Sequence, residues 1–177
     1  MGILEIFGIK TAEVEKKAPS EASQTIRKIA ESLDKMEPKQ AKYIASFAYI
    51  LGRVAHADLH VSENETREME RIVQGLGGLP EEQAILVVQI AKTQNMLFGS
   101  TENYVVTREY NEVATRAQKV ALLHCLFAVS SADQSISTIE DNEIRRISSE
   151  LKLDHKDFIA ARSSYRQHLA VLKKKDS

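Results

Sequence analysis

The chain has 177 residues, which at roughly 100–200 residues per domain corresponds to one domain or two small ones. Hydrophobic residues make up 43% and charged residues 28%, with 7 Gly, 3 Pro and no Trp, which excludes collagenous, low-complexity and highly charged disordered chains and favours helices over a turn-rich β-sandwich. The formal net charge is −1, so no overall positive field attracts nucleic acid and we expect no nucleic-acid partner.

Residues 1–19 are predicted to form a flexible or weakly amphipathic segment ahead of the folded domain. The apolar side chains of residues 3–9 could dock on a membrane surface or a partner, or pack on the body of the protein as a frayed end. We expect neither an ordinary secretion signal nor a membrane span, because no apolar run approaches the ~18 residues that a span needs. The single cysteine, Cys125, cannot form an intrachain disulfide, which favours a cytoplasmic location.

Four helices are predicted after this segment from caps, breakers and apolar spacing. Their expected ranges run from Ser20 or Ser23 to before Pro38, from Pro38 to about Ala57, from the S-x-x-E capping box of Ser62 and Glu65 to Gly77-Gly78, and from Pro80 to about Asn95. In the third of these helices, Met69, Ile72, Val73 and Leu76 fall on the face expected to point inward.

An internal repeat connects the two halves of the chain. With an offset of 75 residues, Ala57-Asp58 aligns with Ala132-Asp133, and conservative or identical pairs continue through the next 20 positions. Identical residues in this alignment are Ser62 and Ser137, Glu65 and Glu140, Glu68 and Glu143, Arg71 and Arg146, Ile72 and Ile147, and Leu76 and Leu151.

The repeat predicts a second set of four helices. They are expected from about Thr101 to Val113, from there to about Ala132, from the Ser137–Glu140 capping box to about Leu151, and from about Asp154 to Leu172. The predicted fold is therefore all-α, with about eight helices in two pseudo-twofold-related four-helix units that share one core. Residues 20–173 form the predicted domain, with halves at about 20–97 and 98–173, and residues 174–177 form a tail.

Two acidic turns are the most informative motif. In AHADLHVSENE (55–65) and SSADQSISTIE (130–140), an Asp ends one long helix and a Glu follows seven positions later in the first turn of the next. The carboxylates at the two ends of each turn, Asp58 with Glu65 and Asp133 with Glu140, could converge on a hard divalent cation. Alternatively, Asp accepts N–H groups of the turn while Glu completes the capping box, and no cofactor is involved.

This doubled pattern, carried by Ala57-Asp58, Val61 and Glu65 and by Ala132-Asp133, Ile136 and Glu140, resembles the TerB-like family, the tellurite-resistance-associated module, over about residues 20–165. The resemblance implies an all-helical pseudo-twofold fold, a role in chemical-stress response and membrane-linked complexes, proposed metal sensing and no established enzymatic activity. The family favours Gly directly after each Asp, whereas this chain has Leu59 and Gln134, whose side chains disfavour a positive φ. We therefore expect the turns to be reshaped.

Histidines offer an alternative site. His56, Asp58 and His60 alternate as H-x-D-x-H, and His124 lies on the helix that the repeat pairs with the one bearing His56. Imidazole and carboxylate ligands suit zinc or another transition metal, so a helical-bundle metalloenzyme is the alternative to a non-enzymatic module. The sequence lacks the common phosphate-loop, nucleophile-elbow and H-E-x-x-H motifs, and we expect no enzymatic activity.

Charge is unevenly distributed along the chain. Residues 58–82 carry a net charge of −5, and residues 145–175 carry a net charge of +6. Solvated helix faces account for such runs, but the opposite poles could also orient a protein partner or drive assembly into a homodimer. A protein partner is expected, although the sequence does not identify it.

Overall fold

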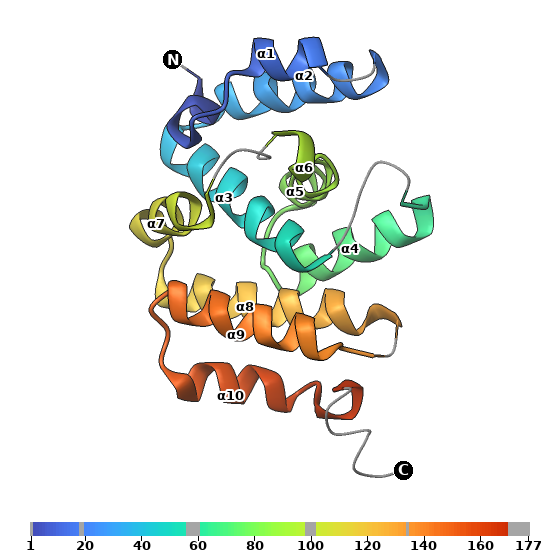
Figure 1. Ribbon diagram of the computed structural model, residues 1–177, viewed down its shortest axis with the longest axis vertical. Coiled ribbons are helices and arrows are strands. Elements are labelled where there is room, and N and C mark those ends of the chain that lie inside the picture. The colour runs from blue at the N-terminus through green and yellow to red at the C-terminus, as the bar shows by residue number, and fades with distance from the viewer. Residues whose placement is uncertain (1, 18–19, 56–60, 98–101, 134, 170–177) are drawn as a thin grey trace.

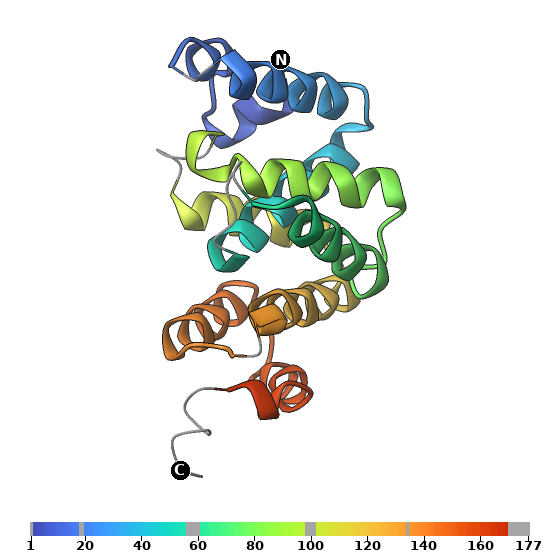
Figure 2. The same cartoon turned by 90° about the vertical axis from the view of Figure 1, so that its right-hand side faces the viewer.

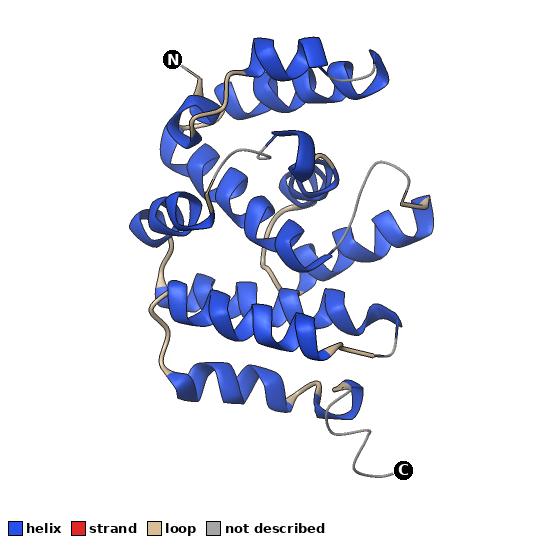
Figure 3. Cartoon of the chain, viewed as in Figure 1, coloured by secondary structure: helices blue, strands red, loops and turns tan. Residues whose placement is uncertain are grey.

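The computed structural model describes residues 2–17, 20–55, 61–97, 102–133 and 135–169, and within these ranges the chain is helical with no strand (Figures 1 and 3). The elements in chain order are η1 (Ile3–Phe7), α1 (Thr11–Lys17), α2 (Ser20–Asp34), α3 (Pro38–Ala55), α4 (Glu63–Gly75), α5 (Glu81–Lys92), α6 (Gln94–Leu97), α7 (Asn103–Val113), α8 (Arg116–Ser130), η2 (Ser131–Asp133), α9 (Thr138–Glu150), α10 (His155–Ser163) and η3 (Arg166–His168). The predicted all-α fold is confirmed.

Helix α3 forms the centre of the molecule. Pro38, whose ring fixes a helical φ, occupies its first position, and almost every residue from Tyr43 to Val54 is buried. It packs against α5, α7 and α8 and so joins elements from both halves of the chain. Figures 1 and 2 show α1 and α2 at one end of an elongated stack and α10 at the other, with α3 running obliquely between them.

The helices that follow the two acidic turns keep the offset of the sequence repeat. Helix α9 begins and ends 75 residues after α4. The Ser62 hydroxyl accepts from the Glu65 N–H at 3.2 Å, and Ser137 and Glu140 form a complete reciprocal capping box with distances of 3.0 and 3.1 Å. The Ser137–Glu140 capping box is confirmed, and so is the cap by Ser62, but among the described residues the Glu65 carboxylate does not return the bond that a complete box requires. The pseudo-twofold relation of two four-helix units stays a prediction.

Three details of the helix predictions are wrong. The helix that begins after Pro80 stops at Lys92 rather than Asn95, because the backbone of Thr93 leaves the helical conformation, with φ −103° and ψ 7°, and α6 follows as a separate element. Helix α10 ends at Ser163 rather than Leu172, and the chain turns into η3. Leu76, predicted to point inward, is 43% exposed because α4 ends at Gly75 and Leu76 already belongs to the turn toward α5.

The N-terminal segment contributes to the core. Ile3, Leu4, Phe7 and Ile9 are buried, while Ile6 is exposed. The Ile3 N–H donates to the Asp34 carboxylate at 3.2 Å, which ties η1 to the end of α2. A membrane contact through residues 3–9 stays a prediction, and it would require these buried side chains to leave the core. None of the helices described is long and apolar enough to cross a bilayer.

Lys152 provides a test of the local backbone. It follows α9 with a φ of 60°, the left-handed conformation that glycine adopts most easily. We expect Lys152→Gly to raise the free energy of unfolding by about 1 kcal/mol, because the steric cost of the side chain is removed. Urea unfolding measures the change. Lys156→Gly, inside α10, is the control and should lower stability by about 1 kcal/mol.

Candidate functional site

A cleft of 560 Å³ lies where the end of α3, helix α4, the end of α8 and the start of α9 meet, and Figure 1 shows these elements together on one side of the molecule. It is lined by Val54, Ala55, Val61, Asn64, Glu65, Glu68, Met69, Ile72, Val129, Ser130, Ala132 and Glu140. Both acidic turns of the sequence repeat contribute to this lining. The repeat thus brings two distant segments to one site.

The cleft has an apolar floor and an acidic rim. Val54 and Met69 are buried in the core, and Ile72 and Val129 pack against it. Glu65 and Glu68 on α4 and Glu140 on α9 supply three carboxylates. The Glu68 carboxylate is paired with Arg71 at 3.0 Å, but both side chains are more than half exposed, so this pair holds little energy. The rim therefore attracts cations.

The two glutamates of the acidic turns differ in what they do. The Glu140 carboxylate accepts from the Ser137 N–H at 3.1 Å, so it has the structural role that the capping interpretation gives it. The Glu65 carboxylate makes no such reciprocal bond, and among the described residues it has no hydrogen-bond or ion-pair partner. Glu65 is thus available to bind a ligand without loss of a capping bond.

Several predicted site residues lie outside the described part of the chain. These are Asp58, His56 and His60, together with the side chain of Asp133. Their chain neighbours Ala55, Val61 and Ala132 all line the cleft. Within the described ranges, no three histidine, cysteine, aspartate or glutamate residues are grouped so that they could hold a metal ion. Cation binding at the two acidic turns therefore stays a prediction.

His124 does not line the cleft. It lies on α8, partly buried, and its peptide carbonyl accepts from the Tyr165 hydroxyl at 3.4 Å. Cys125, the next residue, is fully buried, and burial raises the pKa of its thiol to about 12. No thiolate therefore forms there at neutral pH.

Two features of the site were not predicted from the sequence. Ser130 is only 4% exposed and lines the cleft, yet among the residues that the structure describes its hydroxyl has no hydrogen-bond partner. Arg53, beside Val54, is bonded through its guanidinium to Glu143 at 2.6 and 2.9 Å and to Glu150 at 2.8 Å. The sequence does contain a signal for the serine, because the repeat aligns Ser130 with Ala55, a polar residue with an apolar one. It contains none for the arginine, which pairs with residues far away in sequence.

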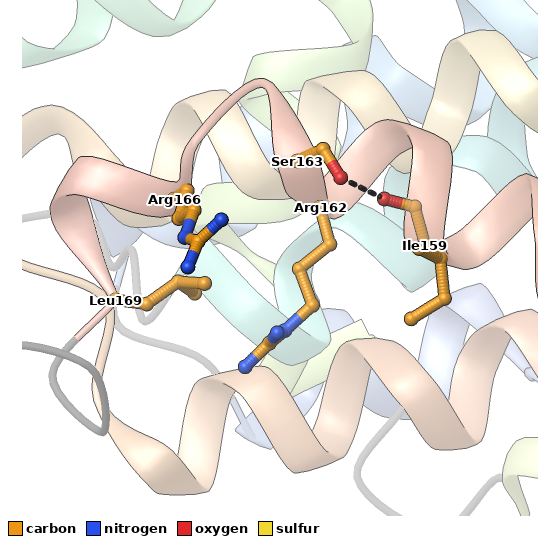
Figure 4. Close-up of a pocket in the computed structure, with 5 residues that line it drawn as sticks. All are labelled: Ile159, Arg162, Ser163, Arg166 and Leu169. Carbon is orange, nitrogen blue, oxygen red and sulfur yellow. Dashed lines mark hydrogen bonds between the residues drawn. The ribbon is translucent and has the colours of Figure 1, made fainter.

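A second, smaller cavity of 170 Å³ lies between α10, η3 and α9, lined by Ile159, Arg162, Ser163, Arg166 and Leu169 (Figure 4). Arg162 is already bonded to both carboxylate oxygens of Asp141 at 3.0 and 2.9 Å, and the Ser163 hydroxyl donates to the Ile159 carbonyl at 2.8 Å. Most of its polar groups are therefore occupied within the fold. The larger cleft is the better candidate site.

A family model described as tellurite resistance protein TerB matches residues 43–163, from the first turns of α3 to the end of α10. The match includes every residue that lines the larger cleft. It leaves out η1, α1 and α2, of which the resemblance over residues 20–165 covered only α2. No curated protein and no solved structure matches the chain.

Proposed function

Because the chain belongs to the family of the tellurite resistance protein TerB, we propose that it is a non-enzymatic helical module that acts in a chemical-stress response of the tellurite type by binding a protein partner. The cleft between α3, α4, α8 and α9 is the proposed binding surface. The observation that carries the proposal is its apolar floor beneath an acidic rim. A cytoplasmic location suits the single buried thiol of Cys125.

The lining specifies the chemistry of the partner. Ile72 and Val129, which are only partly buried, offer a surface for one or two aliphatic side chains, whose burial supplies affinity. Glu65 and Glu68 favour lysine or arginine beside those side chains, and the same carboxylates repel phosphate groups. A short segment of a protein that combines aliphatic and basic residues fits best.

A comparison of charge variants tests this proposal. Glu65→Lys combined with Glu68→Lys reverses the rim on α4, whereas Glu81→Lys combined with Glu82→Lys makes the same charge change on exposed residues of α5 that do not line the cleft. Among proteins captured from native extracts by the wild type, we expect at least one to be retained by the α5 variant and lost by the α4 variant. Identical capture by both variants would refute the cleft as the binding surface.

Cation binding at the same cleft is a separate question. It is worth testing because the Glu65 carboxylate and the Ser130 hydroxyl have no partner among the described residues. A cation bound only to the folded state stabilises it by RT ln(1 + [L]/Kd), about 2.7 kcal/mol at a hundredfold excess over Kd. Because Leu59 and Gln134 replace glycines and Glu140 already caps α9, we expect the Asp residues to act as turn caps instead.

Under this capping account, Asp58→Asn keeps an accepting oxygen and should change stability by less than about 0.5 kcal/mol, whereas Asp58→Ala should cost about 0.5–2 kcal/mol. The results should be the same with and without millimolar Ca²⁺, Mg²⁺ or Zn²⁺ in thermal melts. A rise in melting temperature of several degrees with one of these cations, lost in both Asp58→Asn and Glu65→Gln, would establish a cation site instead.

A further inference from the structure

We propose that the segment after Leu169, with the sequence Ala170-Val171-Leu172-Lys173-Lys174-Lys175, binds in the acidic cleft of its own chain and competes there with the protein partner. The proposal rests on the proposed function, because it assigns a regulator to the same cleft. The segment lies outside the described residues, so the inference is drawn from its sequence and from where the described chain ends.

The described chain ends beside the second acidic turn. Leu169 and Ile136 are both fully buried and form an isolated parallel bridge, and the Ile136 N–H donates to the His168 carbonyl at 2.6 Å. Ile136 lies between Ala132 and Glu140, both of which line the cleft. The bridge therefore anchors the last described residue to the turn that connects two residues of the cleft lining, Ala132 and Glu140.

The direction of the chain at this bridge also favours the cleft. In a parallel pair the two segments run in the same direction, so the described chain reaches Leu169 in the direction in which it passes Ile136. That direction leads to the first turn of α9, where Glu140 lies. Six extended residues span about 20 Å, which is well beyond one turn of a helix, so residues 170–175 can pass along the cleft lining.

The chemistry of the segment matches that of the cleft. Three aliphatic or small residues precede three lysines, and the cleft joins an apolar floor to the carboxylates of Glu65, Glu68 and Glu140. The other place near Leu169 is the smaller cavity of Figure 4, which Leu169 lines together with Arg162 and Arg166. Lysines are repelled by Arg166 there and attracted by the acidic rim, so charge selects between the two places.

Tethering makes even a weak contact effective. A short flexible linker gives an effective concentration of about 1 mM, so a segment with a dissociation constant of about 0.1 mM would weaken a competing ligand about tenfold. We use a fluorescent peptide with the sequence of residues 169–177 as the probe. It should bind the full-length Lys173→Glu, Lys174→Glu, Lys175→Glu variant about tenfold more tightly than the wild type, whose own segment occupies the cleft.

Zero-length carbodiimide cross-linking locates the contact in the full-length protein. We expect amide links from residues 173–175 to Glu65 or Glu140 within the monomer band, identified by peptide mass spectrometry. These links should be lost when both glutamates are replaced by glutamine, which can still complete the α9 capping box. They should persist in Glu63→Gln, a nearly fully exposed carboxylate on α4 that does not line the cleft.

Each other outcome overturns the proposal. Links found only between two chains would assign the cleft to a second copy, and links spread evenly over exposed carboxylates, Glu63 included, would show that the segment has no defined site. Equal affinity of the peptide for the wild type and the triple variant would exclude competition. The test is independent of the partner experiment, because a cleft that captures a partner but forms no intramolecular link would refute only the inference drawn here.

Discussion

Replacing Arg53 with alanine is expected to lower the free energy of unfolding by about 3 kcal/mol. The Arg53 side chain is only 4% exposed and joins α3 to Glu143 and Glu150 on α9, which lie on the same side of that helix two turns apart. Truncation leaves the Glu150 carboxylate without its cation and leaves Glu143 only the exposed Arg146, at 3.6 Å. The loss is at the lower end of the range for a buried ion pair because both glutamates keep about one-quarter of their exposure.

Arg146→Ala is the matched control for this prediction. Arg146 approaches the same Glu143 carboxylate at 3.6 Å, but its side chain is 69% exposed, and its removal should cost less than about 1 kcal/mol. Chemical denaturation followed by circular dichroism measures both variants. Equal losses would show that the Arg53 contacts contribute no more than a surface pair. Because Arg53 fixes α9 against α3, the first variant should also weaken partner binding in the cleft.

The features that the sequence predicts well depend on local signals. The Ser62 and Ser137 caps, the start of α3 at Pro38 and the inward face of α4 at Met69 and Val73 all follow from residues within one or two turns of each other. The repeat extends these local signals to the helices in the second half of the chain. It placed α9 correctly because the same cap and apolar spacing recur 75 residues later.

The features that the sequence does not predict depend on contacts between distant segments. The burial of Phe7 needs α2 and α3 to cover it, and the pairing of Arg53 with Glu150 joins residues 97 positions apart. Helix ends inside amphipathic patterns are equally hard to predict, since the apolar spacing continues past Ser163 while the helix does not. Periodicity alone cannot show where tertiary packing ends a helix.

In the candidate site, too, local motifs are predicted from the sequence and contacts between distant segments are not. The doubled motif predicts a site at each of the two turns, whereas the structure places Glu65 and Glu140 in the lining of one cleft. The apolar floor was not expected, because Val54, Ile72 and Val129 each belong to a face that local spacing assigns to the closed core. That floor supports the proposal that the carboxylates form the rim of a protein-binding surface.

The second large effect is expected at the end of the molecule opposite to α1. Phe158 on α10 is 1% exposed, lies with its ring centroid 5.9 Å from that of Phe127 on α8, and has the Arg145 guanidinium 5.2 Å from its ring. We expect Phe158→Ala to cost about 3–5 kcal/mol, because a cavity opens where α10 packs on α8. Urea unfolding of the full-length protein measures this loss.

Ile159→Ala, one residue further along the same helix, is the control, since Ile159 is 42% exposed and its truncation should cost less than about 1 kcal/mol. Helix α10 also leads to Leu169, whose bridge with Ile136 holds the exit of the proposed regulatory segment beside the cleft. Phe158→Ala should therefore reduce the intramolecular cross-links to Glu65 and Glu140, while Ile159→Ala leaves them unchanged. If Phe158→Ala matched its neighbour in stability and cross-linking, the packing of α10 on α8 would not be what anchors this end of the chain.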